Sequence, residues 1–351
     1  MMIQNNYKVK KVIDLFLIKR KMQSSELYQE LKKEKVNISL ITVKRILSEL
    51  TLQGFLEKFG SGRSTNYELT TPGRVLADID AKQYVAIEPD KRYGFDKYNF
   101  NLWSSFPINI FTQEELERLK QATKKHKNKT REISATIQKK EMERLIIELS
   151  WKSSKIEGNT YSLLDTEKLI LENKEALGHS KYETQMILNH KDAFNYIYSY
   201  ASQFQTITRK NLEELHSIIV KDLNVGLGIR SKPVGITGSI YKPLDNVYQI
   251  TEAINGLSKV ISKNNVAYNR ALLALLGISY IQPFEDGNKR LSRLMTNALL
   301  ISHSLVPLSY RSIDEEEYRS ALLVFYEINS ITPMKKLFIE QYEFATENYF
   351  L

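Results

Sequence analysis

The sequence contains no cysteine, which excludes disulfide bonds, thiol nucleophiles and cysteine-based metal sites. Glycine and proline are scarce, at 14 and 8 of 351 residues, so a disordered or turn-rich chain is not expected. No apolar run approaches the roughly 20 residues of a membrane-spanning helix, and Met1–Asn6 carry no apolar signal core. These absences predict a globular, mainly α-helical, cytoplasmic protein without a membrane partner.

The composition predicts two domains and a basic N-terminal part. Hydrophobic residues make up 42% and charged residues 26% of the chain, whose length is enough for about two cores. The formal net charge is +9, and residues 1–80 hold 14 Lys and Arg against 9 Asp and Glu. A bias of this size is compatible with contact to nucleic acid but does not establish it.

Residues 1–80 have the pattern of a winged helix-turn-helix domain. Apolar spacing predicts three short helices, one over Tyr7–Lys19, one capped by Ser24 or Ser25, and one capped by Ser39. Two short strand-like segments then flank glycines within residues 55–69, which predicts a β-hairpin. If the third helix enters the major groove, DNA contacts come from Thr42, Lys44, Arg45, Ser48 and Arg63. Domains of this type also dock proteins, so both functions remain open.

The remaining chain divides into a connector and a helical body. Residues 81–115 lack sustained periodicity but are dense in aromatic residues, which predicts a packed connector rather than a flexible tether. The lysine-rich stretch Lys120–Lys140 is explained by solvated helix faces. Residues 116–351 are almost wholly helical by apolar spacing. The expected helices are Glu132–Glu157, Leu163–Asn173, Tyr182–Ser202, Arg209–Asp222, Ile250–Ile261, Tyr268–Ile281, Lys289–His303, Glu315–Ile328 and Thr332–Asn348.

The most informative stretch is Gln282–Arg293, with the sequence QPFEDGNKRLSR, which lies between two expected helices. Backbone N–H groups of residues 287–289 lie at a helix start, where they can hold an anion with the help of the helix dipole. Asp286 is a hard oxygen ligand suited to Mg²⁺ shared with phosphates. Arg290 and Arg293 share one helix face and can hold further phosphate oxygens. The stretch therefore predicts a phosphate-binding site.

This stretch resembles the signature of the Fic (Fido) family, His-x-Phe-x-Asp/Glu-Gly-Asn-Gly/Lys-Arg-x-x-Arg. The matching residues are Phe284, Asp286, Gly287, Asn288, Lys289, Arg290 and Arg293. The family transfers AMP from ATP to a Ser, Thr or Tyr hydroxyl of a protein and releases pyrophosphate. The resemblance implies ATP and Mg²⁺ as cofactors, Asp286 as the metal ligand, and a protein substrate. The chain itself is one candidate target, and a homodimer is one candidate assembly.

Gln282 stands at the position of the family's histidine, the general base that deprotonates the target hydroxyl. Glutamine can orient a hydroxyl or a phosphate but cannot accept a proton usefully, and losing a general base typically costs about 10²–10⁴-fold in rate. The histidine nearest in sequence, His303, lies at the far end of the next expected helix, about 20 Å along its axis. The sequence therefore offers no obvious replacement for the base.

A second match lies upstream, at Ser153–Asn159 with the sequence SSKIEGN. Ser153 and Glu157 share one helix face, and Gly158 is placed to end that helix. The stretch resembles the Ser/Thr-x-x-x-Glu-Gly/Asn inhibitory motif of Fic proteins with an N-terminal inhibitory helix. The resemblance implies that Glu157 pairs with Arg293 and blocks productive seating of the γ-phosphate.

Residues 228–241, which include the extended run Val234–Gly238 between Pro233 and Pro243, resemble the β-hairpin flap of the same family. An extended edge there can pair with the backbone of a target protein and hold its hydroxyl at the α-phosphate. The residues expected to dock the target are Val234, Ile236 and Gly238.

The resulting expectation is a winged helix-turn-helix domain in residues 1–80, a packed connector in 81–115 and a Fic domain in 116–351. The Fic domain is expected to be an all-helical core with a short β-hairpin flap. One hypothesis is an adenylyltransferase that is autoinhibited by Glu157 and slowed or disabled by Gln282. The other is a nucleotide-sensing regulator that binds ATP without transfer and contacts DNA or a partner protein. Transfer of another phosphate-containing group also stays open, because the stretch recognises phosphates rather than bases.

Overall fold

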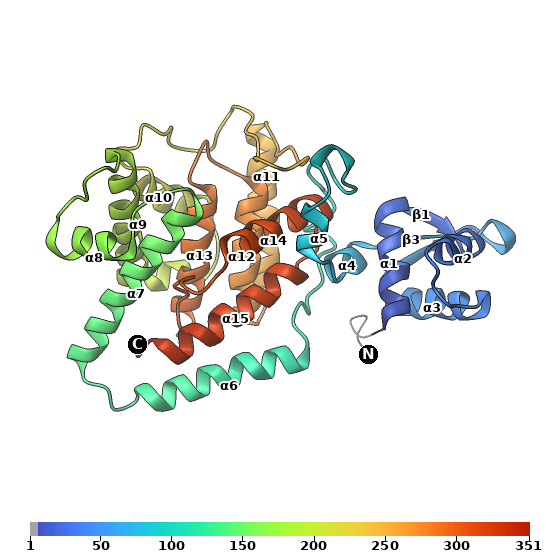
Figure 1. Ribbon diagram of the computed structural model, residues 1–351, viewed down its shortest axis with the longest axis horizontal. Helices are drawn as coiled ribbons and strands as arrows, with labels where there is room; N and C mark the ends of the chain where they lie inside the picture. The colour runs from blue at the N-terminus through green and yellow to red at the C-terminus, as the bar shows by residue number, and fades with distance from the viewer. Residues whose placement is uncertain (1–5) are drawn as a thin grey trace. The chain divides into compact units, whose positions relative to one another are not determined.

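The computed structural model describes residues 6–351, and Met1–Asn5 and the side chain of Arg63 lie outside the described part. The fold is mainly helical (Figure 1). Within residues 6–351 no helix has both the length and the apolar character that crossing a bilayer requires. The chain divides into two compact units, one of Met1–Ile110, Ile236–Lys242 and Arg319–Met334, the other of Phe111–Gly235, Pro243–Tyr318 and Lys335–Leu351.

The first unit begins with three helices and a small antiparallel sheet. The sheet has the strand order β1-β3-β2, and both neighbouring pairs are antiparallel. The elements are α1 (Tyr7–Lys19), β1 (Lys21–Gln23), α2 (Ser24–Lys33), α3 (Leu40–Leu52), β2 (Leu56–Phe59) and β3 (Asn66–Leu69). Apolar side chains of all three helices fill one core, among them Phe16, Leu27, Leu31, Val43 and Leu47.

Helix starts in this unit follow local capping chemistry. The predicted helix over Tyr7–Lys19 is confirmed, and Ser39 caps α3 by accepting the Thr42 N–H at 3.2 Å. The predicted cap of α2 at Ser24 or Ser25 is wrong, because α2 begins at Ser24 and Gln23 is its N-cap residue. The Gln23 N–H donates to the Glu26 carboxylate at 2.8 Å, so the acid in the first turn satisfies an otherwise free donor.

We expect Ser39→Ala to lower the free energy of unfolding by about 1 kcal/mol, because the Thr42 N–H at the start of α3 loses its acceptor. Urea unfolding of the full chain, followed by far-ultraviolet circular dichroism, measures this change. The control is Ser48→Ala, an exposed position of the same helix, which should leave stability unchanged or slightly higher. Equal losses in both variants would argue against a capping role.

The connector of this unit is packed around buried aromatic residues. The short helix α4 (Thr71–Val75) precedes it, and its own helical segments are α5 (Ala81–Val85) and the 3-10 turn η3 (Pro89–Lys91). The buried Trp103 indole donates to the Tyr98 hydroxyl at 2.7 Å. Glu327 of α14 (Glu315–Ile328) has no exposed side-chain surface, and it accepts hydrogen bonds from the Tyr84 and Ser239 hydroxyls at 2.7 Å each. Buried polar groups are therefore partnered here, as a fixed segment requires.

The second unit is a helical body built around α12 and α13, which pack side by side (Figure 1). Apolar residues occur all round α12, and nearly every residue of both helices is buried, as expected of central helices. The predicted spans of α14 and α15 are confirmed. The helices of this body are α6 (Gln113–Thr130), α7 (Ala135–Ile156), α8 (Leu163–Glu172), α9 (Lys181–Ser199), α10 (Arg209–Ile219), α11 (Val247–Lys263), α12 (Ala267–Ile281), α13 (Asn288–Ser302) and most of α15 (Thr332–Asn348).

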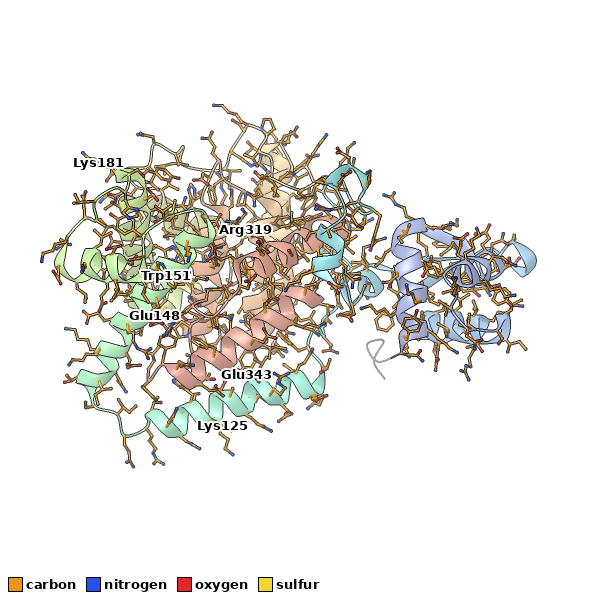
Figure 2. All side chains as sticks on the ribbon, viewed as in Figure 1. Lys125, Glu148, Trp151, Lys181, Arg319 and Glu343 are labelled. Carbon is orange, nitrogen blue, oxygen red and sulfur yellow. The ribbon has the colours of Figure 1, made fainter. Side chains whose placement is uncertain are left out.

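Polar anchors hold α7 within this unit. Its buried Glu148, labelled with Trp151 in Figure 2, accepts a hydrogen bond from the Arg311 guanidinium at 3.0 Å and another from the Tyr349 hydroxyl. The Trp151 indole donates to the Tyr161 carbonyl at 3.1 Å. The lysines of Lys120–Lys140 are exposed on α6 and α7, as predicted for solvated faces.

The predicted β-hairpin flap is wrong in its secondary structure. All of residues 228–246 are described, and they contain no strand. They form a turn in which the Ser239 N–H donates to the Ile236 carbonyl at 3.1 Å, and an isolated bridge joins Lys242 to Lys97. Pro233 and Pro243 have no N–H to give to a strand ladder, and the Arg230 side chain takes up two carbonyls of the segment.

Candidate functional site

Two residues with left-handed backbones position the loop between α12 and α13. Gln282 ends α12 with φ 52°, and its N–H donates to the Ile278 carbonyl at 3.0 Å. Gly287 precedes α13 with φ 80°, a conformation that favours glycine. A Cβ atom at residue 287 would lie 3.3 Å from Val220, so a side chain would also be crowded. The loop therefore turns tightly and leads directly into the N-terminus of α13.

Asn288 and Phe284 fix the loop from inside. The Phe284 N–H donates to the Asn288 side-chain oxygen at 2.9 Å, and the Asn288 amide donates back to the Phe284 carbonyl at 2.8 Å. Phe284 is fully buried, and its ring stacks on His216 of α10 with centroids 3.8 Å apart. The Asn288 side chain thus shapes the loop.

Arg290 and Asp286 face each other at the start of α13. The Arg290 guanidinium, only 2% exposed, donates from Nη2 to Asp286 Oδ2 at 3.0 Å. The same carboxylate oxygen accepts from the Tyr182 hydroxyl of α9 at 3.2 Å. Nη1 of Arg290 is buried and has no hydrogen-bond partner in the structure. A buried guanidinium donor without a partner is costly, so this arrangement favours a bound anion.

The structure brings Glu157 and Arg293 together, although they lie 136 residues apart. Arg293 has no exposed side-chain surface and donates from Nη2 to Glu157 Oε1 at 2.8 Å and to the Ser153 carbonyl at 2.9 Å. Its Nε donates to the Ser153 hydroxyl at 2.8 Å. Lys289 Nζ lies 3.5 Å from the other Glu157 oxygen. Gly158 follows α7 with φ 97° and ends the helix beside the pair.

The charges around Glu157 set its protonation state. Burial raises the energy of its carboxylate, but attraction to Arg293 and Lys289 outweighs burial, so its pKa lies below the ordinary value of 4.5. For Arg293, burial opposes the charge, yet Tyr318 and Glu157 stabilise it and raise its pKa. Both groups are therefore charged near neutral pH.

We expect the stability contributed by Glu157 to be constant near neutral pH and to disappear in acid. A carboxyl whose folded-state pKa is depressed stabilises the fold above its ordinary pKa of 4.5 and loses that contribution as the pH falls through the lower folded-state value. Urea unfolding of the chain and of Glu157→Gln at several pH values measures the difference. It should stay level from about pH 8 to about pH 5 and shrink below that range. A difference that changes between about pH 6 and 8 would contradict this assignment.

The Gln282 side chain turns back onto the end of α12. Its amide nitrogen donates to the Ser279 carbonyl at 2.6 Å, and the residue is 8% exposed. The nitrogen and oxygen ends of a side-chain amide have nearly the same shape, so the hydrogen bond to a carbonyl identifies this end as the nitrogen. The backbone carbonyl of Gln282 accepts a hydrogen bond from the Arg230 guanidinium at 2.7 Å. Gln282 thus caps a helix, and it carries no group that accepts a proton usefully.

Long-range packing adds residues that motif spacing did not identify. Arg230 is 2% exposed and donates to the backbone carbonyls of Gln282, Lys232 and Leu244. It therefore connects the segment 228–246 to the loop. His216 lies against the loop with Nε2 2.9 Å from the Asp286 carbonyl, which identifies Nε2 as the protonated nitrogen. Burial lowers the pKa of His216, so the ring is neutral. Its helix lies 70 residues before Asp286, and only the fold brings it here.

Two histidines that are remote from the loop in sequence lie near it in space. His216 contacts the loop directly, and the fully buried His190 of α9 has no hydrogen-bond partner on either ring nitrogen. Burial, followed by the charges of Arg293 and Arg290, lowers the pKa of His190 well below its usual value. His303 is engaged elsewhere, 3.0 Å from the Arg270 guanidinium.

The remaining predicted residues fall in both units. Lys44, Arg45 and Ser48 are exposed on α3, away from its buried face, while Thr42 is half-buried beside Ser39. The predicted contact of Arg63 falls on a side chain outside the described part. Of the predicted flap residues, Val234 belongs to the second unit, and Ile236 and Gly238 belong to the first.

Comparison with known proteins identifies part of the second unit. The Fic/DOC family model matches residues 206–300, which confirms a Fic/DOC domain in that stretch. The protein adenylyltransferase Fic of Nematostella vectensis is 30% identical over 176 residues, covering 48% of this chain and 40% of that protein. The relative of the same name from Drosophila ananassae is 33% identical over 156 residues, covering 43% and 31%. This chain thus spans less than half the length of either relative.

Solved structures show the same helical fold. A Fic domain containing signaling protein from Bacteroides thetaiotaomicron superposes with a TM-score of 0.57 at 20% identity, covering 66% of this chain and 94% of that one. Fic-1 from C. elegans gives a TM-score of 0.58 at 18% identity, covering 67% and 72%. At these identities the likeness concerns the fold alone.

Proposed function

We propose that the loop Gln282–Arg293 binds ATP–Mg²⁺ and that the chain is an adenylyltransferase restrained by Glu157 and impaired by Gln282. The observation that carries this proposal is the buried, unpartnered Nη1 of Arg290 at the N-terminus of α13. The matched relatives are named protein adenylyltransferases, which supports AMP transfer to a protein hydroxyl as the reaction class.

The cations at the start of α13 support a polyphosphate ligand. Lys289, Arg290 and Arg293 pair with two acids, Glu157 and Asp286, whereas Glu285, the other acid of the loop, is exposed and forms none of these ion pairs. Three phosphate groups placed near the start of α13 would add acceptors for Arg290 and for free backbone N–H groups of the first turn. In this proposal, Gly287, Asn288 and Lys289 form the nucleotide site together with the two arginines.

Asp286 fits a shared magnesium ion. Among residues 6–351 no group of three or more His, Cys, Asp and Glu side chains could hold a metal ion by itself. Mg²⁺ commonly binds through one or two carboxylates together with substrate phosphates, and the half-exposed Asp286 supplies one carboxylate. When bound, Mg²⁺ would neutralise phosphate charge. Tyr182 and Arg290 would hold the Asp286 side chain in position through its Oδ2 atom.

Glu157 is proposed as the inhibitory residue because it competes for Arg293. Its carboxylate accepts a hydrogen bond from Nη2 of the Arg293 guanidinium, and Ser153 and Tyr318 accept from Nε and Nη1. A γ-phosphate that requires Arg293 must displace this carboxylate. The position of Ser153 and Gly158 at the end of α7 supports a helix end that is built for this contact.

Gln282 favours a second candidate function, a nucleotide sensor that binds ATP without transferring AMP. Its amide is engaged with Ser279, and the protonated Nε2 of the neighbouring His216 is engaged with the Asp286 carbonyl. The basic nitrogen of His216, Nδ1, has no hydrogen-bond partner but is buried, so neither side chain presents an exposed base to an acceptor hydroxyl. Transfer would then depend on positioning and phosphate electrostatics alone.

Labelled ATP distinguishes these two functions. The chain, Glu157→Gly and Glu157→Gly/Gln282→His are incubated with ATP labelled at the α-phosphate, and covalent label on the protein is measured. Label with Glu157→Gly supports an adenylyltransferase. Label only with the double variant supports a sensor with a latent site. No label in any form, together with no ATP affinity by calorimetry, would contradict both functions.

We also propose that residues 1–80 form a winged helix-turn-helix domain that binds DNA. The support is the exposed Lys44 and Arg45 on α3 and the strands β2 and β3 that follow it. A cytoplasmic location, a protein substrate with a Ser, Thr or Tyr hydroxyl, and a homodimer belong to the same proposal. A protein partner on α3 is the alternative, and the next experiment separates it from DNA.

We expect the Lys44→Ala/Arg45→Ala variant to bind duplex DNA more weakly and with a shallower salt dependence. Losing two phosphate contacts should reduce the slope of log affinity against log salt by about 2. Gel shifts of genomic fragments at several salt concentrations measure this slope. Lys124→Ala/Lys125→Ala removes the same charge from exposed positions of α6 and should leave the slope unchanged. No gel shift of the full chain even at low salt would favour a protein partner.

A further inference from the structure

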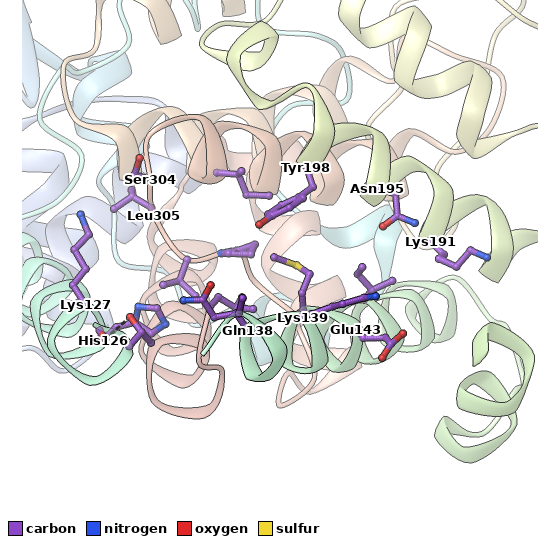
Figure 3. Close-up of a pocket in the computed structure, with 18 of the residues that line it drawn as sticks. His126, Lys127, Gln138, Lys139, Glu143, Lys191, Asn195, Tyr198, Ser304 and Leu305 are labelled. Atoms are coloured by element: carbon purple, nitrogen blue, oxygen red, sulfur yellow. Dashed lines mark hydrogen bonds between the residues drawn. The ribbon is translucent and has the colours of Figure 1, made fainter. Parts of the chain in front are cut away.

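The second unit contains a cavity of about 690 Å³ that is separate from the loop. None of the residues Gln282–Arg293, and neither Ser153 nor Glu157, lines it. It lies among α6, α7, the end of α8, α9 and the chain that follows α13 (Figure 3). Along α13, Ile301 of the cavity lies about 12 Å beyond Arg293, and along α7, Ile146 lies about 16 Å before Glu157, so the cavity is well separated from the Glu157–Arg293 pair. A volume of this size is typical of small-molecule sites.

Two helices, α7 and α9, each give one face to the cavity. On α9 the lining residues Lys191, Asn195 and Tyr198 recur at spacings of four and three, and on α7 Met142 and Ile146 are four apart. Figure 3 shows these side chains of α9 opposite those of α7, among them Gln138, Lys139 and Glu143. The cavity is therefore bounded mainly by helices, and residues 304–307 and Leu351 complete its lining.

Part of the cavity lining is apolar, and the space beside this part is not filled by the protein. Met142, Ile146, Ile170, Ile301 and Leu305 line it, and each of them remains only half-buried. At its edge Leu171 is 47% exposed and Tyr198 is 55% exposed. Grouped apolar surface left open on a folded protein is typical of a binding site for a ligand with an apolar body.

The charged groups of the lining favour an anion. Three lysine side chains, Lys127, Lys139 and Lys191, line the cavity against one acidic side chain, Glu143, while the last residue, Leu351, adds its terminal carboxylate. Lys191 Nζ lies 3.7 Å from the Asp192 carboxylate, and with this neighbour the side chains alone still carry one positive charge in excess. His126 adds no charge, since burial lowers its pKa, and its Nε2 lies 3.0 Å from the Tyr349 carbonyl.

From these features we propose that the cavity binds a small amphipathic anion, with its apolar body among Met142, Ile146 and Ile301 and its head group near Lys139 and Lys191. The ligand class is an aliphatic carboxylate or a molecule of equivalent shape and charge. This site does not depend on the function proposed for the loop, because no residue is shared.

Decanoate is the probe for this site, and decanol and decyltrimethylammonium are matched ligands with the same chain. Each is titrated into the full chain by calorimetry, below the concentration at which it forms micelles. We expect saturable 1:1 binding of decanoate, at least about tenfold tighter than that of decanol, and weakest binding of the cation. No saturable binding of decanoate, or equal affinity for decanoate and decanol, would overturn the proposal.

Variants locate the binding. Lys139→Glu/Lys191→Glu should weaken decanoate binding by about tenfold or more, whereas Lys124→Glu/Lys125→Glu makes the same charge change at exposed positions outside the cavity and should not. Ile146→Trp fills the cavity and should abolish binding of decanoate while the circular dichroism spectrum is retained. Equal weakening in both charge variants, or unchanged binding in Ile146→Trp, would overturn the proposal.

Discussion

Replacing Gln282 by histidine in the Glu157→Gly form is expected to raise the rate of AMP transfer by about 10²–10⁴-fold. The gain is the usual contribution of a positioned general base, which the amide of Gln282 cannot supply. The left-handed backbone at this residue, φ 52°, is one that histidine adopts more readily than most residues. The side chain must leave the Ser279 carbonyl to reach a substrate, which exchanges a helix cap for a catalytic contact.

Initial rates of label transfer from α-labelled ATP to the chain itself, at saturating ATP, measure this gain. The matched control is Gln282→Asn in the same Glu157→Gly background, which keeps an amide and should show no increase. The two neutral histidines near the loop make the comparison informative. If His216 already served as the base, Gln282→His would change the rate little and His216→Asn would remove the transfer seen with Glu157→Gly.

Arg293→Met is expected to destabilise the fold by about 3 kcal/mol or more, because it leaves the Glu157 carboxylate without its main partner. The loss is limited by Lys289, which still lies 3.5 Å from that carboxylate. Arg293→Met/Glu157→Met removes both charges and should recover most of the stability, since paired deletion of a buried ion pair is often nearly neutral. Urea unfolding of the two single variants and the double variant measures the coupling. Additive losses would contradict a direct, buried ion pair.

Local chemistry made much of the fold predictable. Apolar spacing predicted α1, α14 and α15 with the bounds that the structure has, and Ser39 was placed correctly as a cap. These elements combine regular periodicity with strong end signals, so neighbours along the chain decide them. The strand β1 was not predicted, because it has three residues and only Met22 of them is buried. Antiparallel pairing with β3, which is distant in sequence, is what makes these residues a strand.

The candidate site was predictable only where a motif recorded it. The proximity of Glu157 to Arg293 followed from resemblance to a family, not from any local property of residues 136 positions apart. Tyr182 of α9, His216 of α10 and Arg230 of the segment after α10 reach the loop, and the sequence around each of them contains no sign of this contact. The absent flap strands have the same cause. The Arg230 side chain occupies two backbone carbonyls of this segment, and its two prolines have no N–H to donate across a hairpin. Only the folded chain shows where Arg230 lies.

The central claim is that the start of α13 binds ATP–Mg²⁺ and that Glu157 limits this binding. Calorimetric titration of ATP–Mg²⁺ into the full chain, Glu157→Gly and Glu157→Gly/Arg290→Gln tests it most directly. We predict 1:1 binding to Glu157→Gly that is about tenfold tighter than to the unsubstituted chain. Replacing Arg290, whose buried Nη1 has no partner in the structure, should weaken that binding again. Equal affinity in all three forms, or no binding to Glu157→Gly, would contradict the account.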